Sequence, residues 1–515
     1  MNRLALSLAL FGAGFAGACS GGGSTPAPPP PVGGFSNSSL KGQYSFSMSG
    51  QDSGGFFARV GSFTADGSGN ITAGIEDVNT ASAVQTLTFT NSTYSIQADG
   101  RGTVNLTNST GTLIFSVTMI SATQGLIAQT DGIATASGTF LLQNAAAFSA
   151  TAIANGYVFD VSGIDSSNNP DSIVGQFVSS GGGTITTGVL DENDNATPSG
   201  AATITNGTYQ LDATNGPTFG RGAVAFTAGG VTFNYVFYMV DGSRLRMMET
   251  NSTALTVGDA IAQANSVPTT NAGFTGSFAM LIGGGSGAGP DARLGRFTSD
   301  GNGGLTAVVL HDNDAGNFQS VPKGTVSQAS YSIDTTLPGS GRGTATFNDS
   351  SLGTYKFIFY LVSATQGVIQ DNSNLVIDDG TLLAQTGGPF TNANVAGNYA
   401  FNWSGISTNN STLVTAEEDF VGQLALSSST SNNVTGALDL SEFSSNQGVF
   451  LNIVLSGGLT INGDGTQSNG LTTTLQTNPS GTINFKAIPV NPSTIFVLTS
   501  DNSRTTAGIM QKQSP

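Results

Sequence analysis

Residues 61–71 read GSFTADGSGNI, and this stretch decides the fold because the chain repeats it. The pattern returns as GQFVSSGGGTI at 175–185 and as GRFTSDGNGGL at 295–305. In each copy a glycine-rich turn separates two short strand-like runs. An Asp-Gly pair at such a turn, as in the first and third copies, supplies the positive φ of a tight β-hairpin. Self-similarity of this kind is the signature of a repeat architecture.

Further markers keep the same order along the chain. An aromatic opening strand places Tyr44, Tyr157, Phe278 and Tyr399 at spacings of 113, 121 and 121 residues. Gly-Arg-Gly stands at 100–102, 220–222 and 341–343, and Ser-Ala-Thr-Gln-Gly stands at 121–125 and 363–367.

These markers predict four homologous β-repeats, which we number 1 to 4. Their predicted boundaries are 36–146, 153–265, 272–388 and 393–515. Repeat 4 is divergent, because it lacks Gly-Arg-Gly. The linkers are short and small or polar, so we expect neighbouring repeats to lie like beads with limited contact.

The local pattern is β throughout. Alternation is clearest at 112–121, where Leu113, Phe115, Val117 and Met119 share one face that must be buried. Tyr235 and Phe357 are the matching inward residues of repeats 2 and 3. The strand-like runs of repeat 1 are 43–51, 56–65, 70–78, 86–97, 102–108, 112–121, 125–130 and 135–143.

Eight sequential strands joined mostly by hairpins favour an all-β fold. We expect four tandem antiparallel β-domains of about 110–120 residues, each an eight-stranded up-and-down barrel, since closure removes exposed edges. A two-sheet immunoglobulin-like β-sandwich is the alternative.

The N-terminal residues 1–18 have the pattern of a secretory signal peptide, with Arg3 before an apolar run and small residues before Cys19. Ala16-Gly17-Ala18-Cys19 is similar to the lipobox at which bacterial lipoproteins are cleaved and lipidated. Residues 19–35 then form a Gly/Pro-rich tether. We expect Cys19 to attach a lipid and to anchor the protein in the cell envelope, at the outer membrane or the cell surface. An ordinary secretory peptide is the alternative.

The aromatic strand, G-x-F-x-x-D-G-x-G-x-I, D-x-N and G-R-G together resemble a group of tandem-repeat lipoproteins of acidobacterial-type soil bacteria. The resemblance covers residues 36–388 well and 394–515 weakly. It implies repeated β-domains and an envelope location, and it supplies no catalytic residues.

The charge balance argues against nucleic acid as a partner. The chain has 15 Lys and Arg against 32 Asp and Glu, a formal net charge of -17 and a pI near 4.1. An acidic surface repels a polyanion. The 31 Phe and 10 Tyr argue against disorder. Cys19 is the sole cysteine, so lipidation leaves no thiol for a disulfide.

Candidate catalytic chemistry is sparse. His311 is the only histidine, and it stands where repeats 1, 2 and 4 carry Asp77, Asp191 and Asp439, which disfavours a Ser-His-Asp triad. Zinc is disfavoured because its sites use several His or Cys ligands. Carboxylates adjacent in sequence point to opposite faces of a strand, unlike the facing pair of a glycoside hydrolase. We assign no catalytic residues.

Calcium is the metal that the sequence favours most. Oxygen-bearing side chains alternate at Asp191, Asn193 and Asn195, and again at Asp312 and Asp314. The sequence lacks the invariant glycine and the bidentate glutamate of an EF-hand loop. Because Asp and Asn also suit β-turns without a metal, turn chemistry is the preferred interpretation and no cofactor is assigned.

Recurring Asp and Arg residues predict a structural clamp. Asp77 and Asp191 end the third strand of their repeats, and Arg101 and Arg221 begin the fifth. The planar arginine fork suits a carboxylate on a neighbouring strand. We expect each clamp to form within one repeat. Arg342 of repeat 3 and Asp439 of repeat 4 are the further candidates, each in a repeat that lacks the other member.

Two function classes remain. The first is a non-catalytic binding, adhesion or scaffold protein, in which repetition gives multivalency toward an extracellular polymer or protein ligand. The second is an envelope-associated hydrolase of carbohydrate or polymer. An enzyme should bring carboxylates together in one repeat, whereas a binding array should repeat one exposed patch. The first class is favoured. Trp403, the sole tryptophan, is assigned to the core rather than to sugar stacking.

Overall fold

The computed structural model describes residues 34–251, 254–321, 326–350, 353–409, 414–431, 433–443, 448–463, 467–475 and 481–515. The predicted signal peptide, Cys19 and the tether up to residue 33 lie outside the described residues. Four antiparallel β-sheets follow one another along the chain, one for each repeat. The prediction of an all-β fold with four tandem β-domains is confirmed. No helix in the described segments is long and apolar enough to cross a membrane.

Repeat 1 closes into an eight-stranded barrel. Its strands run in the order β2-β1-β9-β8-β7-β6-β5-β3, and β3 pairs again with β2. A 3-10 turn, η1 (Asn37–Ser39), precedes the first strand. The strands are β1 (Lys41–Asp52), β2 (Gly55–Asp66), β3 (Asn70–Asn79), β4 (Val84–Thr88), β5 (Ser92–Ile96), β6 (Arg101–Asn108), β7 (Gly111–Ser121), β8 (Gln124–Gln129) and β9 (Ala134–Leu142).

The single strand predicted at 86–97 is wrong. The run divides into β4 and β5, which pair with opposite ends of β3. The chain turns at Asn91, whose φ of 50° lies in the left-handed region. Asparagine tolerates this region better than most residues.

Repeats 2 and 3 curl in the same way but remain open barrels. Their sheets run β13-β12-β11-β10-β19-β18-β17-β16-β15 and β23-β22-β21-β20-β28-β27-β26-β25-β24, with β14 paired to β12. Isolated bridges link the two ends of each sheet, from Thr184 to Thr208 and from Gly304 to Ser330.

The elements of repeat 2 begin with two short turns after repeat 1. They are η2 (Ala145–Ala147), η3 (Ala150–Ala152), β10 (Gly156–Ile164), β11 (Pro170–Ser179), β12 (Ile185–Asp194), β13 (Thr197–Pro198), β14 (Ala202–Thr203), β15 (Thr205–Leu211), α1 (Gly216–Phe219), β16 (Arg221–Ala228), β17 (Val231–Asp241), β18 (Arg244–Glu249) and β19 (Leu255–Ala262).

Repeat 3 follows the same plan. Its elements are η4 (Asn271–Gly273), β20 (Thr275–Ser286), β21 (Pro290–Asp300), β22 (Leu305–Asp314), β23 (Asn317–Val321), β24 (Val326–Ile333), β25 (Arg342–Asp349), β26 (Gly353–Ser363), β27 (Gln366–Asp371) and β28 (Val376–Ala384).

Repeat 4 is a closed eight-stranded barrel whose strands pair in sequence order. A short helix, α2 (Asn392–Val395), leads into it. Its strands are β29 (Gly397–Asn409), β30 (Val414–Leu426), β31 (Val434–Phe443), β32 (Gly448–Ile461), β33 (Gln467–Leu475), β34 (Gly481–Asn491), β35 (Thr494–Thr499) and β36 (Arg504–Lys512).

Each barrel holds its own apolar core. Phe115, Tyr235 and Phe357 are almost fully buried and lie in three separate clusters, which confirms the predicted inward face. Trp403 is fully buried in the core of repeat 4 and stacks on Phe401, with ring centroids 4.1 Å apart. Its assignment to the core is confirmed. Removal of these aromatic faces from water drives the closure of each sheet.

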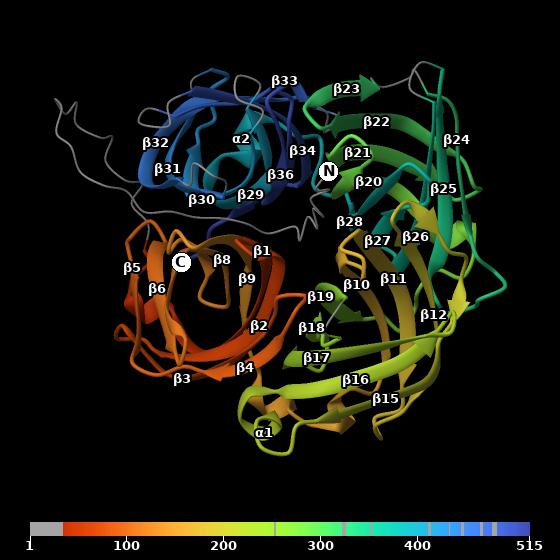
Figure 1. The fold of residues 1–515 in the computed structure, drawn as a ribbon. Helices are drawn as coiled ribbons and strands as arrows, with labels where there is room; N and C mark the ends of the chain where they lie inside the picture. Colours follow the sequence, from red (N-terminus) through yellow and green to blue (C-terminus); the bar gives the residue numbers. More distant parts are fainter. Residues whose placement is uncertain are drawn as a thin grey trace.

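The four barrels form a closed ring. Figure 1 shows them around a common centre, with repeat 4 lying against repeat 1. Ser121 of repeat 1 forms a parallel bridge with Ser514 at the end of the chain. Buried apolar clusters join each repeat to the next around the ring. The expectation of beads with limited contact is therefore wrong, because the outward faces of several strands are also apolar and pack against a neighbouring barrel.

A glutamine after the last strand of each repeat fastens that repeat to the next. Gln143 Nε2 donates to the carbonyls of Phe219 and Met239 in repeat 2 at 3.0 and 2.5 Å. Gln263 and Gln385 bind carbonyls of the following repeats in the same way. Gln513 of repeat 4 reaches back to two carbonyls of repeat 1 at 2.9 Å. Because this contact recurs at all four interfaces, it belongs to the assembly of the ring.

Candidate functional site

The clamp residues pair between repeats and not within them. Arg221 of repeat 2 binds Asp77 of repeat 1 through two parallel contacts, with Nε and Nη2 at 2.8 and 2.9 Å from the two carboxylate oxygens. Tyr238 donates a further hydrogen bond to Asp77 at 2.7 Å. The hydrogen bond to Asp77 raises the pKa of the Arg221 guanidinium. Such a bidentate charged pair fixes the relative orientation of the two barrels.

The next interface repeats this arrangement. Arg342 of repeat 3 donates to Asp191 of repeat 2 at 2.7 and 2.8 Å, and Tyr360 donates to the same carboxylate at 2.6 Å. The prediction of clamps within one repeat is therefore wrong. The aspartate lies on the outer face of its barrel, where the nearest arginine belongs to the following repeat, and spacing along the chain does not reveal this.

At the interface between repeats 4 and 1, the equivalent arginine and aspartate lie farther apart. Arg101 Nη1 lies 3.8 Å from Asp439 and donates to Asn452 at 2.9 Å. Its nearer carboxylate is Asp99 of its own repeat, at 2.8 Å. Burial raises the pKa of Asp439 to about 6, and the Arg101 charge partly offsets this effect.

The interface between repeats 3 and 4 differs from the others, with Lys486 Nζ of repeat 4 at 5.7 Å from the centre of the Phe318 ring of repeat 3. His311 takes the aspartate position, with Nδ1 2.8 Å from Ser320 Oγ and its ring stacked on Phe318. Burial, helped by the charge of Lys486, lowers the pKa of His311 to about 3. Leu281 and Ile488 belong to an apolar cluster that spans this interface. The loss of the aspartate in one repeat is thus matched by the absence of Gly-Arg-Gly from the next.

The calcium candidates take part in protein contacts. Asp191 is bound by Arg342, and Asn193 donates to the carbonyls of Asp371 and Val376 in repeat 3. Asp312 accepts from Arg293, Asp314 accepts from Ser286, and Asn195 occupies a left-handed turn. Across the described segments, no group of three His, Cys, Asp or Glu side chains is placed to hold a metal ion.

A cavity of about 600 Å³ lies at the centre of the ring, and all four repeats line it. Ligand sites for small molecules have volumes of about 300–1,000 Å³. The charged lining residues come only from repeats 2 and 3. They are Asp160, Asp241, Arg244, Arg246, Asp259 and Asp379.

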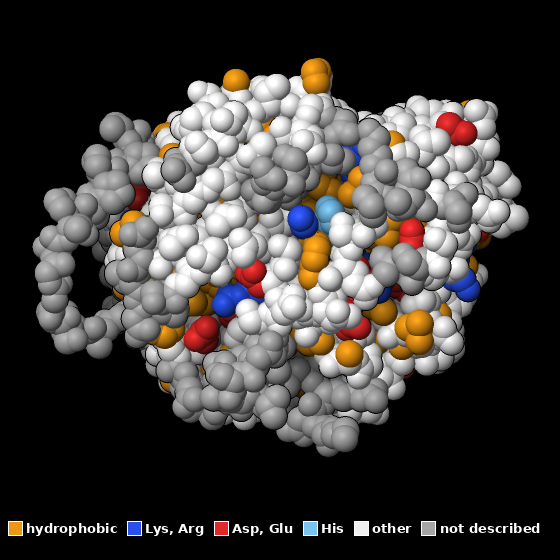
Figure 2. Space-filling view, turned by 90° about the horizontal axis from the view of Figure 1, so that it is seen from above, with side chains coloured by type: hydrophobic (Ala, Val, Ile, Leu, Met, Phe, Trp, Pro, Cys, Tyr) orange, Lys and Arg blue, Asp and Glu red, His pale blue; other side chains and the backbone are white. Residues whose placement is uncertain are grey.

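Charge is scarce elsewhere in this protein. Only 9% of the residues are charged, and Figure 2 shows a face on which charged side chains are few and lie in small groups. Another such group surrounds Arg293, which lies near Asp291, Asp312, Asp371 and Asp378. The group at the central cavity differs from it because it lies where all four repeats meet.

The charged wall of the cavity is unique to repeat 2. The register of the last two strands places Arg244, Arg246 and Asp259 at equivalent positions to neutral residues in repeats 1 and 3. Those residues are Gln124, Leu126 and Thr139 in repeat 1, and Gln366, Val368 and Thr381 in repeat 3. A contact that the fold requires is expected to recur in every repeat, as the glutamine contact does. A set of charges that occurs once indicates a local function.

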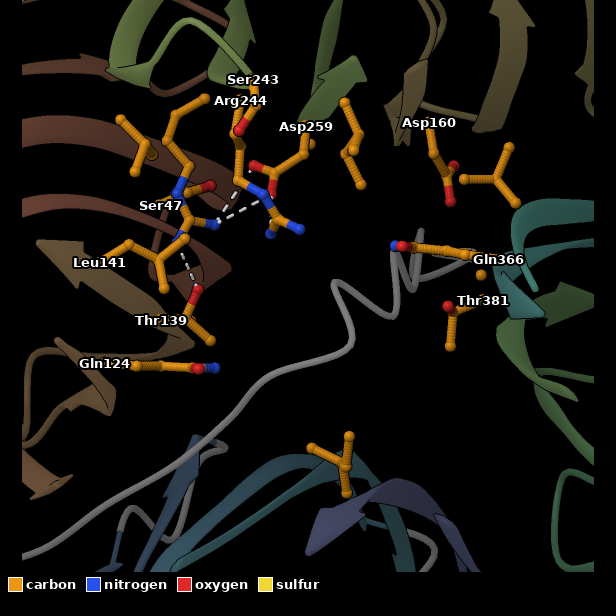
Figure 3. A pocket seen from close by; sticks show the side chains of 18 of the residues that line it. Ser47, Gln124, Thr139, Leu141, Asp160, Ser243, Arg244, Asp259, Gln366 and Thr381 are labelled. Carbon is orange, nitrogen blue, oxygen red and sulfur yellow. Dashed lines mark hydrogen bonds and ion pairs between the residues drawn. The ribbon is translucent and has the colours of Figure 1, made fainter. Parts of the chain in front are cut away.

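Asp259 binds both arginines of this wall. Arg244 Nη1 donates to Asp259 at 3.0 Å, and Arg246 Nη1 donates to it at 3.2 Å. Arg246 also donates to Thr139 of repeat 1 at 2.6 Å, a contact drawn in Figure 3. Two guanidinium groups share this carboxylate, and Asp241 adds a second carboxylate to the same lining. The Arg244 side chain is 31% exposed and that of Arg246 is 4% exposed, so a molecule in the cavity meets Arg244.

A pair of carboxyl groups lies on another side of the cavity. Asp160 of repeat 2 lies beside Asp379 of repeat 3, and among the described residues Asp160 Oδ1 and Asp379 Oδ2 are buried without a hydrogen-bond partner. Burial, followed by the charge of Asp379, raises the pKa of Asp160, and burial also raises the pKa of Asp379. Such a pair offers carboxyl oxygens to the cavity, and a carboxyl that holds its proton can also donate a hydrogen bond. Figure 3 shows Asp160 near Gln366 and Thr381, away from Arg244.

Sequence reasoning missed this site because it relied on motifs that the repeats share. A signal was present: Asp-Gly-Ser-Arg at 241–244 stands where Ser-Ala-Thr-Gln stands at 121–124 and 363–366. A position-by-position comparison of the repeats singles out Arg244. Asp160 and Asp379 belong to different repeats, and only the ring brings them together.

No protein-family model and no curated protein sequence matches this chain. Among solved structures, the isotype 1 transferrin binding protein B of serogroup B Neisseria meningitidis aligns with 73% of this chain and 78% of its own, at 10% identity and a TM-score of 0.20. CghA aligns with 86% of this chain and 98% of its own, at 10% identity and a TM-score of 0.15. At these scores neither likeness carries an argument. The resemblance to tandem-repeat lipoproteins stays a prediction.

Proposed function

We propose that this protein is a non-catalytic binding protein of the cell envelope and that its ligand site is the central cavity. The observation that supports this proposal best is the charged wall of Arg244, Arg246 and Asp259 in a cavity whose equivalent positions in repeats 1 and 3 are neutral. A binding site needs a few fixed polar groups on a concave surface. The ring holds these groups in place through contacts on both sides of each barrel.

Binding is tested with a variant that gives repeat 2 the lining of repeat 1. The substitutions are Arg244→Gln, Arg246→Leu and Asp259→Thr, each to the residue that repeat 1 carries at the equivalent position. Small polar metabolites are screened against residues 20–515 by thermal shift, and hits are measured by calorimetry. We expect the parent chain to be stabilised by a ligand that the variant no longer binds. A hit that binds both chains equally moves the site elsewhere, and a screen without hits contradicts the proposal.

The proposed location is tested separately. The signal-like segment, the small residues before Cys19 and the tether after it support a lipid anchor. Cys19→Ala is expected to release the protein from the membrane fraction or to leave its precursor uncleaved. A mature protein that remains in the membrane fraction contradicts the anchor.

A hydrolase is the second candidate, and the Asp160–Asp379 pair is the observation that favours it. Carboxyl pairs that share a proton occur in aspartic proteases. The pairs of retaining and inverting glycosidases are at least about 5 Å apart, whereas these two carboxyls lie side by side. Turnover of a polypeptide or a polysaccharide by the parent chain and its loss in Asp379→Asn support a hydrolase. Binding without turnover supports the binding protein.

A further inference from the structure

We propose that the ligand of the central cavity is a carboxylated sugar, with its carboxylate on Arg244 and its hydroxyl groups near Asp160 and Asp379. This inference rests on the proposed binding function and adds the chemical class of the ligand.

The carboxylate is assigned from Arg244. The hydrogen bond that the structure gives its side chain uses Nη1 alone, toward Asp259. A guanidinium has five donors in a planar fork, so Arg244 can bind Asp259 and still present donors to the cavity. Asp259 is already shared with Arg246, and Asp241 is the second carboxylate on this side of the cavity. A partly exposed guanidinium with unused donors fits a planar carboxylate.

The hydroxyl groups are assigned from the other polar lining residues. The Asp160–Asp379 pair offers carboxyl oxygens, of which Asp160 Oδ1 and Asp379 Oδ2 have no hydrogen-bond partner among the described residues, and such acceptors suit hydroxyl groups. Gln124, Gln366, Thr381 and Ser243 add neutral donors and acceptors to the lining. The chemistry of the walls therefore requires one anionic group and several neutral hydrogen-bonding groups on the same small molecule.

Other ligand classes fit less well. A second anionic group on the ligand would lie among the carboxyl groups of the lining, Asp160, Asp241 and Asp379, which disfavours dicarboxylates and nucleotides. Phe496 is the aromatic residue among the described lining, so a large flat ring has little surface on which to stack. A cation would have to lie beside the guanidinium groups of Arg244 and Arg246.

The test compares glucuronate with its methyl ester and with glucose, by calorimetry on residues 20–515. The ester keeps the hydroxyl groups and the size of the sugar but loses the charge. We expect the acid to bind at least about tenfold more tightly than either neutral sugar, the difference that a charge-assisted hydrogen bond typically provides. Arg244→Gln carries the residue of repeats 1 and 3 at this position, and it is expected to erase the preference for the acid while the ester binds as before.

The matched control removes a positive charge far from the cavity lining. Lys356 is exposed on β26 and does not line the cavity, so Lys356→Gln should retain the preference for the acid. Equal binding of acid and ester, or an Arg244→Gln chain that still prefers the acid, overturns the inference. Absence of binding by all three sugars also overturns it. The proposed binding function is tested separately by its own screen. A neutral or cationic ligand that binds the parent chain and not the triple variant would support the site but contradict the carboxylated sugar.

Discussion

Asp77 shows how much a single buried carboxylate contributes to this molecule. It accepts hydrogen bonds from Arg221, Tyr238 and Thr86, and it is 1% exposed. Asp77→Asn removes the charge and leaves the arginine opposite a neutral amide. Breaking one side of a buried ion pair costs about 3 kcal/mol. We expect calorimetry to show a clearly lower unfolding temperature.

The control for Asp77 uses the same arginine. Asp212 accepts from Arg221 Nη1 at 2.7 Å on the more exposed side, where its side chain is 28% exposed. Asp212→Asn is expected to cost less than about 1 kcal/mol, as exposed pairs do. Equal losses for the two variants contradict a clamp between repeats.

Buried carboxyl groups also predict an unusual pH dependence. Burial raises the pKa of Asp419 to about 7. The folded protein therefore holds this proton more tightly than the unfolded chain, whose carboxyl has a pKa near 3.9. The resulting stability is complete below about pH 4 and is lost as the pH rises to about 7. We expect the unfolding temperature to fall between pH 5 and pH 7.5, and Asp419→Asn to reduce this fall.

Asp66 serves as the control for this pH dependence. It ends β2 and is partly exposed, and hydrogen bonds, the largest from Asn70, lower its pKa to about 2. Asp66→Asn should therefore leave the fall between pH 5 and pH 7.5 unchanged. An unfolding temperature that is constant or rises over this range argues against burial of these carboxyls.

At the residue scale, recurrence in the sequence identifies important side chains but not their partners. Asp77, Asp191, Arg221 and Arg342 are recognised because they recur, and the structure places each in a buried pair. The partner lies in the neighbouring repeat, because a barrel wall has an outer face that the strand pattern does not assign to any neighbour. Arg244 and Asp259 are recognised in the opposite way, because they differ from the residues at the equivalent positions of repeats 1 and 3.

At the scale of the element, β7 shows the two faces of a barrel wall in adjacent residues. Phe115 points into the core and is fully buried, whereas Ile114 is 38% exposed. Phe115→Ala is expected to cost about 3–5 kcal/mol through the lost apolar contacts and the cavity left behind. Ile114→Ala should cost much less. Chemical denaturation measures both, and similar costs would contradict the assigned face.

Most strands of repeat 1 could be predicted because their alternation and their Asp-Gly turns agree. The break in the run 86–97 could not be predicted, because Asn91 adopts the left-handed conformation and no glycine marks the position. A second missed feature is the close contact between the first and last strands. A Cβ at Gly138 would lie 1.8 Å from the Ser47 carbonyl, and Gly258, Gly380 and Gly508 have the same close contacts. These glycines let the sheet close.

At the scale of the whole molecule, the ring predicts compact dimensions. A compact body of this length has a radius of gyration of about 23 Å. Small-angle scattering of residues 20–515 should give a value close to this after allowance for the tether. Four barrels in a row would give a clearly larger radius, and such a value contradicts the ring.

Weakening the interface between repeats 4 and 1 tests the ring by the same scattering measurement. Gln513 binds two carbonyls of repeat 1, and Ser514 forms the closing bridge. Deletion of 513–515 together with Arg101→Ala removes the contacts of Gln513, Ser514 and Arg101 across this interface. We expect a larger radius of gyration for this variant with unchanged β content by circular dichroism. An unchanged radius would show that the apolar contacts and the remaining hydrogen bonds, such as that between Thr135 and Ser441, hold the interface.

The ring itself could not be derived from periodicity, although a trace of it exists in the sequence. Phe357-Ile358-Phe359-Tyr360 is a continuous apolar run, and each of these residues is buried. A strand with both faces covered reads in this way. The run indicates that the outer face of this strand is covered. It does not indicate that a neighbouring repeat covers it, nor that repeat 4 packs against repeat 1.

The wall that repeat 4 adds to the central cavity has a consequence for biosynthesis. Phe496, Ile509 and Gln511 lie close to the C-terminal end of the chain. Translation proceeds from the N-terminus, so the first three barrels emerge from the ribosome before these residues exist. We therefore expect an intermediate in which three barrels surround the centre of the ring and the side of repeat 4 is open. A premature stop codon before repeat 4 would leave the cavity without Phe496, Ile509 and Gln511, so its lining is complete only after the last barrel has been made.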